Sequence, residues 1–348
     1  MTTVQAMNET NNFPTPQAGL DLLARLKAEA LSMANPPTET NFEAGFFRCR
    51  TANQCLSDAK SQPVPTDLFY SLWFENELTI LFADTGVGKS VYAVQIADTI
   101  SHNRKVLYID LELSDKQFQK RYSDNFENEY RFNENFYRIS FKSRYSIPEG
   151  TSYEDYFIVS LVNLLDRTGA QVVIIDNMTR LISADTDKAQ TAKPVMDRLN
   201  DLKFDYGLSI LCLEHTRKTS SSQPISLNDL QGSKMKSNFA DSAFTIGRST
   251  RDPNMRYVKQ LKARSCENIY DNENIIVYEI IKETNFLHFS FIEYGNESDH
   301  LKHVEENEKS ARVEQILALH SQGISNRAIA LQLSITEGAI RKCLKKHA

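Results

Sequence analysis

The sequence predicts an α/β fold with a mostly parallel sheet, an antiparallel extension of that sheet, and a small all-α domain at the C-terminus. Three observations predict this fold. Short apolar runs alternate with helical patterns as far as about residue 215; strand-like runs then follow one another from about 240 to 294; and the chain after about 306 has only helical periodicity. The 348 residues are enough for one large α/β domain and a small appendage.

Composition excludes several classes of protein. Apolar residues make up 41% of the chain and charged residues 24%, which is typical of soluble globular proteins. No apolar run approaches the roughly 18 residues that span a bilayer, and the N-terminus lacks the pattern of a signal peptide. We therefore expect a cytoplasmic protein that does not interact with membranes. The 5 cysteines are scattered without metal-ligand spacing, which favours reduced thiols over a zinc site.

Residues 1–65 are predicted to be a partly disordered N-terminal segment. Its first 17 residues are rich in Asn, Thr, Gln and Pro, and an amphipathic helix is predicted over 18–33 before a Pro-containing stretch. This helix is equally compatible with docking on a neighbouring subunit and with closing the core of its own domain.

The stretch LFADTGVGKS, residues 81–90, has the pattern of a phosphate-binding loop. An apolar strand over 77–83 precedes it and a helical pattern follows it, as the motif requires. Backbone N–H groups of such a loop surround the phosphates, Lys89 reaches the terminal phosphates, and Ser90 binds Mg²⁺. Ala83 replaces the usual first glycine, which is acceptable if its φ is negative. The residues expected to bind ATP are Asp84, Thr85, Gly86, Val87, Gly88, Lys89, Ser90 and Val91.

Acidic residues follow two further predicted strands. Asp176 ends the strand in VVIIDN, where a carboxylate can hold Mg²⁺ through water. Glu112 follows the strand in LYIDLEL, where it can polarise the attacking water. Asp110 points the same way along that strand and is the competing candidate. An acidic cluster that caps the next helix is the structural alternative.

The motifs ADTGVGKS, LYIDLEL, VVIIDN and LCLEHTRK together resemble those of RecA-like P-loop ATPases. Within that class the chain is most similar to hexameric replicative helicases of the plasmid RepA type and to the related AAA_25 ATPases of mobile elements. The resemblance covers about 66–294 and implies a RecA-like ATPase domain over 66–295. It also implies that Glu112 is the catalytic base and that His215 senses the γ-phosphate.

The resemblance further implies a homo-oligomer, a hexameric ring, in which a Lys-x-Arg pair enters the neighbouring subunit's site. In VKQLKARS this pair is Lys262 and Arg264. An arginine supplied in trans stabilises the charge on the transferring phosphate. A solvated basic hairpin is the alternative interpretation of these residues.

Single-stranded DNA is the expected partner of the core, because RecA-like rings contact it with loops that follow the later core strands. The polar, Ser-rich stretch 216–238 is such a loop. Its cations predict phosphate contacts that are independent of base sequence and sensitive to salt. A plain surface loop is the alternative. The predicted contact residues are Arg217, Lys218, Lys234 and Lys236.

Three other stretches complete the predicted core. Residues 121–157 are dense in Tyr, Phe, Asn and Arg without a clean period, which favours an insertion at the sheet edge. Residues 240–294 are predicted to be the antiparallel extension. Trp73 and Phe74 are expected to pack beneath the nucleotide site rather than to stack on bases.

Residues 306–348 are predicted to form a helix-turn-helix domain that binds duplex DNA. This segment has seven Lys/Arg and four Glu, a charge of +3, which leaves −8 on the rest of a chain whose net charge is −5. Helices are predicted over 308–320, 325–332 and 336–346, with Gly323 ending the first helix and Ser325 capping the second. The predicted core of the domain is Ile316, Leu319, Ile324, Ala328, Ile329, Leu333, Ile340 and Leu344.

The last of these helices resembles the recognition helix of resolvases and response regulators. Its exposed face would present Thr336, Glu337, Arg341, Lys342 and Lys345 to the major groove. A helical module that binds another protein is the alternative.

Together these features predict an ATP-hydrolysing DNA-binding protein. The leading interpretation is a ring-forming helicase, or a DNA mobilisation or replication ATPase, of a plasmid or mobile element. The alternative is a DNA-binding regulator or recombination accessory protein that uses ATP as an assembly switch. An AAA+ transposition ATPase is disfavoured, because strands follow the core where a helical lid would be expected.

Overall fold

The computed structural model describes residues 41–142, 144–181, 189–217, 221–231, 234–302 and 306–347, together with Ala24. Two compact units make up the chain, Met1–Val64 and Pro65–Ala348. The predicted disordered stretch 1–17 and helix 18–33 lie outside the described residues, apart from Ala24. None of the helices among these residues is long and apolar enough to cross a membrane.

The described part of the first unit is a hairpin followed by a short helix. Strands β1 (Asn41–Ala44) and β2 (Phe47–Arg50) pair in antiparallel fashion, and α2 spans Ala52–Ala59. The Thr51 side chain accepts a hydrogen bond from the backbone N–H of Gln54 and so caps α2. The sequence analysis predicts none of these elements.

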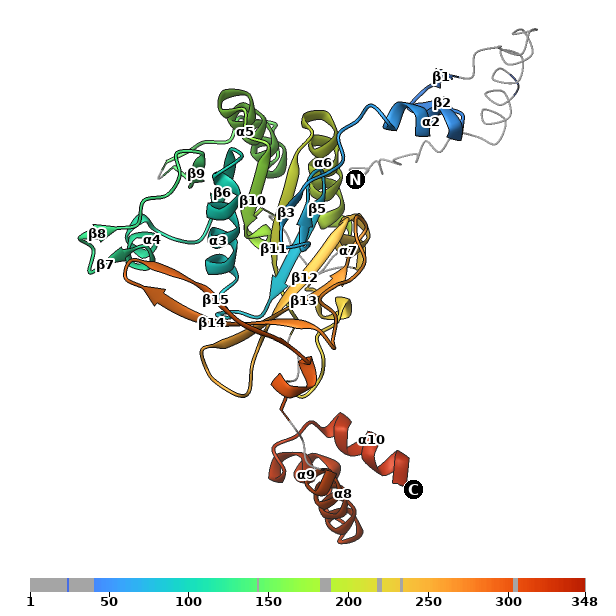
Figure 1. Cartoon of the computed structure of the whole chain (residues 1–348). Helices are drawn as coiled ribbons and strands as arrows, with labels where there is room; N and C mark the ends of the chain where they lie inside the picture. Colours follow the sequence, from blue (N-terminus) through green and yellow to red (C-terminus); the bar gives the residue numbers. More distant parts are fainter. Residues whose placement is uncertain are drawn as a thin grey trace, which may run out of the picture. The chain divides into compact units, whose positions relative to one another are not determined.

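The second unit is built on a sheet that has the order β15-β14-β13-β12-β5-β11-β10-β6-β9 in the described residues (Figure 1). The strands from β12 to β9 in this order run parallel, whereas β13, β14 and β15 are antiparallel to their neighbours. The strand bounds are β5 Leu78–Ala83, β6 Val106–Asp110, β9 Phe136–Ile139, β10 Val172–Asp176, β11 Ser209–His215, β12 Ser242–Arg248, β13 Met255–Lys262, β14 Ile275–Glu283 and β15 Phe286–Gly295.

Helices cover both faces of this sheet, and short hairpins flank it. The helices are α3 Lys89–Ser101, α4 Asp115–Arg121, α5 Tyr153–Thr168, α6 Ala189–Tyr206 and α7 Lys234–Phe239, with 3₁₀ turns η1 Met178–Arg180, η2 Leu227–Asp229 and η3 Glu297–His300. The hairpins pair β3 Asp67–Phe69 with β4 Trp73–Phe74, and β7 Ser123–Asp124 with β8 Asn128–Glu129. The predicted α/β fold with a mostly parallel sheet is confirmed.

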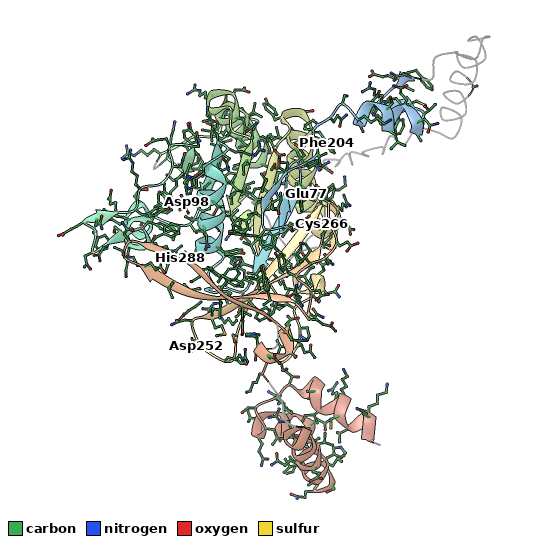
Figure 2. All side chains as sticks on the ribbon, viewed as in Figure 1. Glu77, Asp98, Phe204, Asp252, Cys266 and His288 are labelled. Carbon is green, nitrogen blue, oxygen red and sulfur yellow. The ribbon has the colours of Figure 1, made fainter. Side chains whose placement is uncertain are left out.

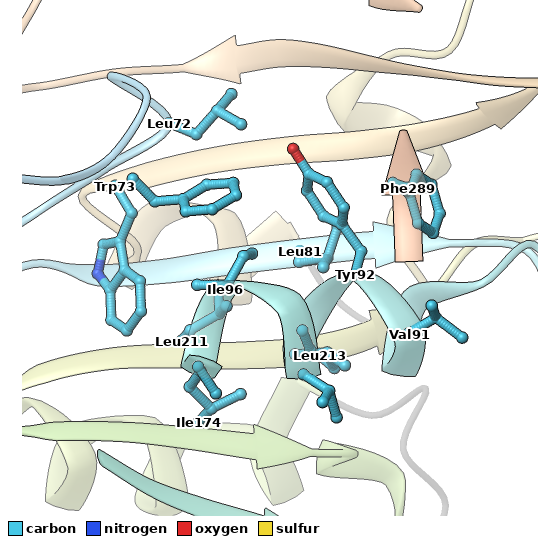
Figure 3. Close-up of a cluster of buried hydrophobic side chains, with 14 of the residues drawn as sticks. Leu72, Trp73, Leu81, Val91, Tyr92, Ile96, Ile174, Leu211, Leu213 and Phe289 are labelled. Atoms are coloured by element: carbon cyan, nitrogen blue, oxygen red, sulfur yellow. The ribbon is translucent and has the colours of Figure 1, made fainter. Parts of the chain in front are cut away.

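Alternation along the strands divides the core into two hydrophobic clusters. Leu81 and Ala83 of β5 pack in the cluster on the α3 side, whereas Ile80 and Phe82 pack in the cluster that contains residues of α5 and α6. Trp73 is completely buried on the α3 side (Figure 3), and Phe74 is half-buried, so both pack as predicted. Their predicted place beneath the nucleotide site is wrong for Trp73, because its indole N–H lies 3.5 Å from the Glu77 carbonyl, before the start of β5, whereas the phosphate loop follows the end of β5.

The first strand of the predicted antiparallel extension is in fact parallel. β12 pairs in parallel register with β5, and the antiparallel part begins at β13. Part of the reason is Glu77, which precedes β5 and is 3% exposed (Figure 2). Its carboxylate accepts hydrogen bonds from the hydroxyls of Ser242 at 2.7 Å and Ser265 at 2.5 Å, and these bonds hold the start of β12 beside the start of β5.

The stretch 121–157 lies at the sheet edge, as predicted, but it contains regular elements that the sequence did not reveal. β9 is the edge strand beside β6, and α5 begins at Tyr153. A strand of four residues is too short to show alternation in the sequence.

The loop after β11 is tied to the segment that follows β15. The Glu297 carboxylate accepts a hydrogen bond from the backbone N–H of Ile225 at 3.0 Å and forms an ion pair with Lys259. Farther along, the backbone N–H of Lys302 donates to the Ser221 carbonyl at 2.8 Å. Both ends of the pair between Glu297 and Lys259 are 1% exposed, so this tie is part of the folded core.

The C-terminal helices α8 (Glu306–Ser321), α9 (Asn326–Gln332) and α10 (Glu337–His347) share a hydrophobic cluster of their own. Ser325 caps α9 as predicted, and Gly323 has a φ of +78°. One predicted core residue is wrong, because Ala328 is exposed and Ala330 is buried instead. The two positions lie about 200° apart around the helix, so Ala328 faces away from the cluster, whereas the predicted neighbours Ile329 and Leu333 lie in it.

Candidate active site

The predicted nucleotide residues meet where the parallel strands end. β5, β11, β10 and β6 are neighbours in the sheet, and their carboxyl ends share one edge. In register, Asp176 lies opposite Asp110, and His215 lies opposite Ala83. Loops that follow these strands therefore place Lys89 and Glu112 at the same edge.

The phosphate loop has the backbone that its glycines allow. Gly86 and Gly88 have φ of +70° and +111°, and a Cβ at Gly88 would lie 2.9 Å from the Ile280 side chain. Ala83, in contrast, is the last residue of β5, is fully buried, and does not have positive φ. Alanine is therefore compatible with the loop at the position where the usual motif has glycine.

Lys89 is buried at the start of α3, and its ammonium group is held by the loop itself. It donates to the carbonyls of Ala83 at 2.8 Å and Asp84 at 3.2 Å, and lies 3.2 Å from His215 Nδ1. Burial lowers the pKa of Lys89, while nearby carboxylates, Asp176 foremost, oppose this shift. These carbonyl partners are what a phosphate group would replace, so Lys89 fits its predicted role.

Asp176 and Ser90, the residues predicted to hold Mg²⁺, lie within hydrogen-bonding distance of each other. Asp176 is 1% exposed, accepts a hydrogen bond from the Tyr108 hydroxyl at 2.6 Å, and is hydrogen-bonded to Ser90. Burial raises the pKa of Asp176 to about 6, and these hydrogen bonds limit the rise. A hydroxyl beside a buried carboxylate suits a hard cation. Mg²⁺ bound to Ser90 and Asp176 would neutralise negative charge on the phosphates.

Two polar side chains, Asn177 and His215, lie between Glu112 and Lys89. The Asn177 side-chain amide donates to the Glu112 carboxylate and lies 3.2 Å from His215 Nε2. Because an ammonium group can only donate, His215 Nδ1 accepts from Lys89, and Nε2 then carries the proton. Nε2 therefore cannot accept from the Asn177 amide, so their 3.2 Å contact is a close approach and not a hydrogen bond. Burial and the charge of Lys89 both lower the pKa of His215, which favours the neutral ring.

Asn177 was missed by the sequence analysis. It is 2% exposed, and its Oδ1 accepts from the backbone N–H of Thr179 at 3.0 Å, so its amide nitrogen is fixed toward Glu112. The sequence does contain a signal, since Asn177 directly follows Asp176 in the same motif.

The structure separates the two candidate carboxylates. Asp110 is 2% exposed and accepts from the backbone N–H groups of Glu112 at 3.1 Å and Leu113 at 2.9 Å. Its other oxygen pairs with Arg138 at 2.9 Å. It therefore stabilises the turn. Contrary to the prediction from the sequence, it does not point the same way as Glu112. Glu112 is exposed and remains the better candidate for the base.

Two arginines for which no role was predicted from the sequence donate hydrogen bonds to carbonyls of the phosphate loop. Arg256 Nε donates to the Val87 carbonyl at 2.9 Å, and Arg248 Nη2 donates to the Thr85 carbonyl at 3.2 Å. Arg256 is buried on β13 and Arg248 ends β12. An isolated arginine in a strand has no local signature, so only the sheet topology reveals this contact.

Lys262 and Arg264 lie away from their own chain's phosphate loop. Lys262 is opposite Ala243, which is opposite Ile80, three residues before the end of β5. The Lys262 ammonium donates to the carbonyls that end α7, and Arg264 pairs with Asp241 at 3.0 Å, with its side chain 56% exposed. Lys262 is therefore engaged within its own chain. Action of the pair in a neighbouring site stays a prediction.

One predicted DNA contact is contradicted. Lys236 is 1% exposed and pairs with Glu214 at 2.6 Å, because a buried carboxylate on β11 needs a buried cation. Arg217 is exposed, as a contact residue must be. Lys218 and the side chain of Lys234 lie outside the described residues.

Comparison with known proteins places the chain in a family. The AAA_25 model, described as an AAA domain, matches residues 48–221. The chain belongs to this family. A solved structure of a KaiC-like protein from the hyperthermophilic archaeon Pyrococcus horikoshii OT3 aligns with a TM-score of 0.46 and 13% identity, over 62% of this chain and 90% of that one. No curated protein matches the sequence.

This AAA_25 protein is a RecA-like P-loop ATPase. Its family implies nucleotide binding and usually Mg²⁺. In the site described above, the loop N–H groups and Lys89 are positioned to bind phosphates, and Ser90 and Asp176 to hold the cation. Glu112, oriented by Asn177, is positioned to accept a proton from water.

Glu112→Gln should leave nucleotide binding intact and slow hydrolysis by about 10²–10⁴-fold, because a general base is lost while the fold is unchanged. Asp110→Asn should mainly lower thermal stability, because Arg138 loses its buried ionic partner. Phosphate release, binding of a fluorescent nucleotide and thermal melting, measured on both variants, separate the two roles. A variant at Asp110 that melts normally but fails to hydrolyse ATP would identify that residue as the base instead.

Asp176→Asn should stabilise the nucleotide-free protein at neutral pH. A carboxyl whose pKa is raised from 3.8 to about 6 is costly to ionise in the folded state, and the asparagine carbonyl can still accept from Tyr108. The variant's free energy of unfolding should exceed the wild type's above pH 6, by on the order of 1–3 kcal/mol. The difference should disappear below about pH 4, where the wild-type carboxyl is protonated in both states.

Urea unfolding between about pH 4 and 8, without nucleotide or Mg²⁺, measures this difference. A wild-type protein more stable than the variant at pH 7 would contradict the assigned cost of burying Asp176. Hydrolysis that depends on Mg²⁺ should be lost in the variant at every pH.

Proposed function

We propose that this ATPase is a ring-forming DNA motor or loader. It would be a helicase of the plasmid RepA type, or a mobilisation or replication ATPase, of a plasmid or mobile element. One observation carries the proposal. The groups expected to bind and hydrolyse ATP gather at the carboxyl edge of the sheet, whereas Arg264 is fixed beyond the far end of β13.

This separation supports a shared site between subunits. Arg264 is over half exposed, and its guanidinium is directed by Asp241. An arginine held in this way cannot stabilise its own chain's phosphates, but it is available to the site of a neighbour. A closed ring, for which six subunits is the proposed number, gives every site one such arginine.

The C-terminal helices support binding to duplex DNA. Residues 333–336 connect α9 to α10, and α10 exposes Arg341, Lys342 and Lys345 along its length. Arg341 pairs with Glu337 at 2.6 Å and is 70% exposed, so it is held in an extended, accessible position. Thr336 caps α10 by accepting from the backbone N–H of Ala339 at 3.3 Å, which makes it a structural residue as well.

A second candidate function is a DNA-binding regulator or recombination accessory protein that uses ATP only as an assembly switch. The burial of Lys236 favours it, because that burial leaves fewer cations on the predicted core loop for gripping a single strand. The two candidates differ in whether hydrolysis produces directional movement on DNA.

A forked duplex with fluorophore and quencher on opposite strands tests the proposal directly. Wild-type protein should form a multimer with an ATP analogue, as measured by light scattering, and should separate the strands only when ATP is hydrolysed. Lys89→Ala is the control, since it removes the ammonium group that contacts the terminal phosphates and should abolish both hydrolysis and unwinding. ATP-dependent assembly on DNA without strand separation would favour the switch over the motor.

Arg341→Ala should weaken binding to a preferred duplex by about 1–3 kcal/mol and relax the preference at one base pair. Arg312→Ala is the matched control, because Arg312 is exposed on α8, outside the proposed recognition helix. Fluorescence anisotropy with the preferred duplex and single-base variants provides the measurement. A uniform loss across all sequences, with the salt slope reduced by about one, would make Arg341 a phosphate contact. Equal affinity of wild type and variant would favour a protein-binding role for these helices.

A further inference from the structure

The segment that follows β9 lies beside the proposed catalytic base. Ile139, the last residue of β9, is in register with Ile109, so the chain leaves β9 next to the turn that contains Glu112. A cavity of about 340 Å³ lies between this turn and the segment, lined by Glu112 on one side and by Ser140 and Phe141 on the other. Because β9 is parallel to β6, this segment emerges at the edge of the sheet where the nucleotide residues gather.

Two aromatic rings project from this segment into solvent. Phe141 is 43% exposed and Tyr145 is 52% exposed. The rings stack on each other with centroids 5.7 Å apart and planes inclined by 15°. Single exposed aromatic residues are common on protein surfaces, but a stacked and exposed pair provides flat apolar faces on which a base can stack.

Cations alternate with these rings. Lys142 and Arg144 are both exposed, and neither forms an ion pair with a carboxylate of the described chain. A third exposed cation, Arg180, comes from the loop after β10. The Tyr153 hydroxyl donates to the Arg180 carbonyl at 3.0 Å. Burial raises the pKa of Tyr153, and the nearby Tyr145 adds to this rise. Rings and cations from two loops therefore share one surface.

The acidic groups nearby are only partly neutralised, because Asp110 and Asp115 share one arginine and Glu112 keeps its charge. Arg138 pairs with Asp110 at 2.9 Å and with Asp115 at 2.6 Å, and the Glu112 carboxylate accepts from Asn177. Glu154 adds a negative charge beside Tyr153. Lys142, Arg144 and Arg180 have no partner among the salt bridges of the described residues, so these three side chains are available to the phosphates of a ligand.

We propose that Phe141, Lys142, Arg144 and Tyr145, with Arg180, form a binding surface for single-stranded nucleic acid. Bases stack on Phe141 and Tyr145, and the backbone phosphates bind Lys142, Arg144 and Arg180. A duplex does not fit this chemistry, because its bases are paired and stacked and present no free faces to side chains. The inference rests on the proposed function in that the protein acts on DNA, but it places the strand on a different loop from 216–238.

The position of this surface places a bound single strand of nucleic acid beside Glu112. Phe141 lines the same cavity as Glu112. A nucleobase stacked on Phe141 therefore packs against the turn that contains Glu112, the proposed general base. Occupancy of the surface thus restricts the motion of Glu112 without any contact to the nucleotide.

The test uses the full chain and two labelled probes, an oligo-dT and an oligo-U of equal length, with anisotropy as the readout. Phe141→Ala/Tyr145→Ala should weaken binding of the preferred probe at least ten-fold, since each lost ring removes a stacked base. Affinity for duplex DNA should stay within two-fold, because no duplex contact is assigned here. Phe204→Ala is the matched control, as Phe204 is 72% exposed on α6, away from this loop (Figure 2), and should change neither affinity.

The charges give an independent readout. Lys142→Ala/Arg144→Ala should reduce the slope of log affinity against log salt by about 1.4, which corresponds to two phosphate contacts on a single strand. The ring variant should leave that slope unchanged, and melting curves establish that all variants fold. A preference for one probe identifies the natural strand as DNA or RNA.

Two results would overturn the proposal. One is single-strand affinity within two-fold of wild type for both double variants. The other is equal weakening of single-strand and duplex binding. In both cases the wild-type protein still binds DNA, so the inference about this surface fails while the proposed function stands. A wild-type protein that binds neither probe nor duplex would instead remove the proposed function, and this inference with it.

Discussion

The parallel alignment of neighbouring strands is the constraint on which the site depends. β12, β5, β11, β10, β6 and β9 all end at one edge, so loops that are far apart in the sequence converge there. Lys89, Glu112, Asp176 and His215 come from four different strand ends. Only Lys89 also depends on an unusual local backbone, the positive φ of Gly86 and Gly88. The register of the sheet does the positioning, which is the general rule for binding sites of open α/β sheets.

The same convergence forces charge into the interior, where it is costly. Asp176 is completely enclosed and has a raised pKa, and Lys89 loses most of its contact with water. The pairs Lys236–Glu214 and Lys259–Glu297 balance further buried charges. Breaking such a pair leaves an uncompensated ion, so these contacts fix the positions of β11 and η3 more than they add net stability. The site is therefore preorganised at the expense of folding free energy.

How far the sequence predicted this site depends on whether each role is local. Gly86, Gly88, Lys89 and Ser90 lie in one loop, and their spacing alone predicts their function. Asp176 required only an apolar strand before it. Lys236, in contrast, follows a polar, Ser-rich stretch and was predicted to be exposed. Its burial depends on Glu214, on a strand that precedes the loop.

Other features were missed for related reasons. Arg256 reaches the phosphate loop from β13, about 170 residues away in the sequence, and no pattern near either residue reveals that contact. β9 has only four residues, too few for a periodicity to be recognised. Asp110 and Glu112 could not be distinguished until the partner of Asp110, Arg138, was located. Tertiary pairing decides each of these cases.

One strand also connects two distant parts of the proposed mechanism. Arg256, near the start of β13, holds the Val87 carbonyl of the phosphate loop, and Lys262 ends the same strand. Arg256 and Lys262 are six positions apart along the extended strand, a distance of about 20 Å. Hydrogen bonds to β12 and β14 keep this distance constant. In a ring of the proposed kind, β13 would transmit displacement of the phosphate loop at one site to Arg264, just beyond the end of the strand, and so to the neighbouring site that this arginine is proposed to enter. The order in which the subunits of such a ring hydrolyse ATP would then be set by the stiffness of β13, and no separate regulatory element would be needed.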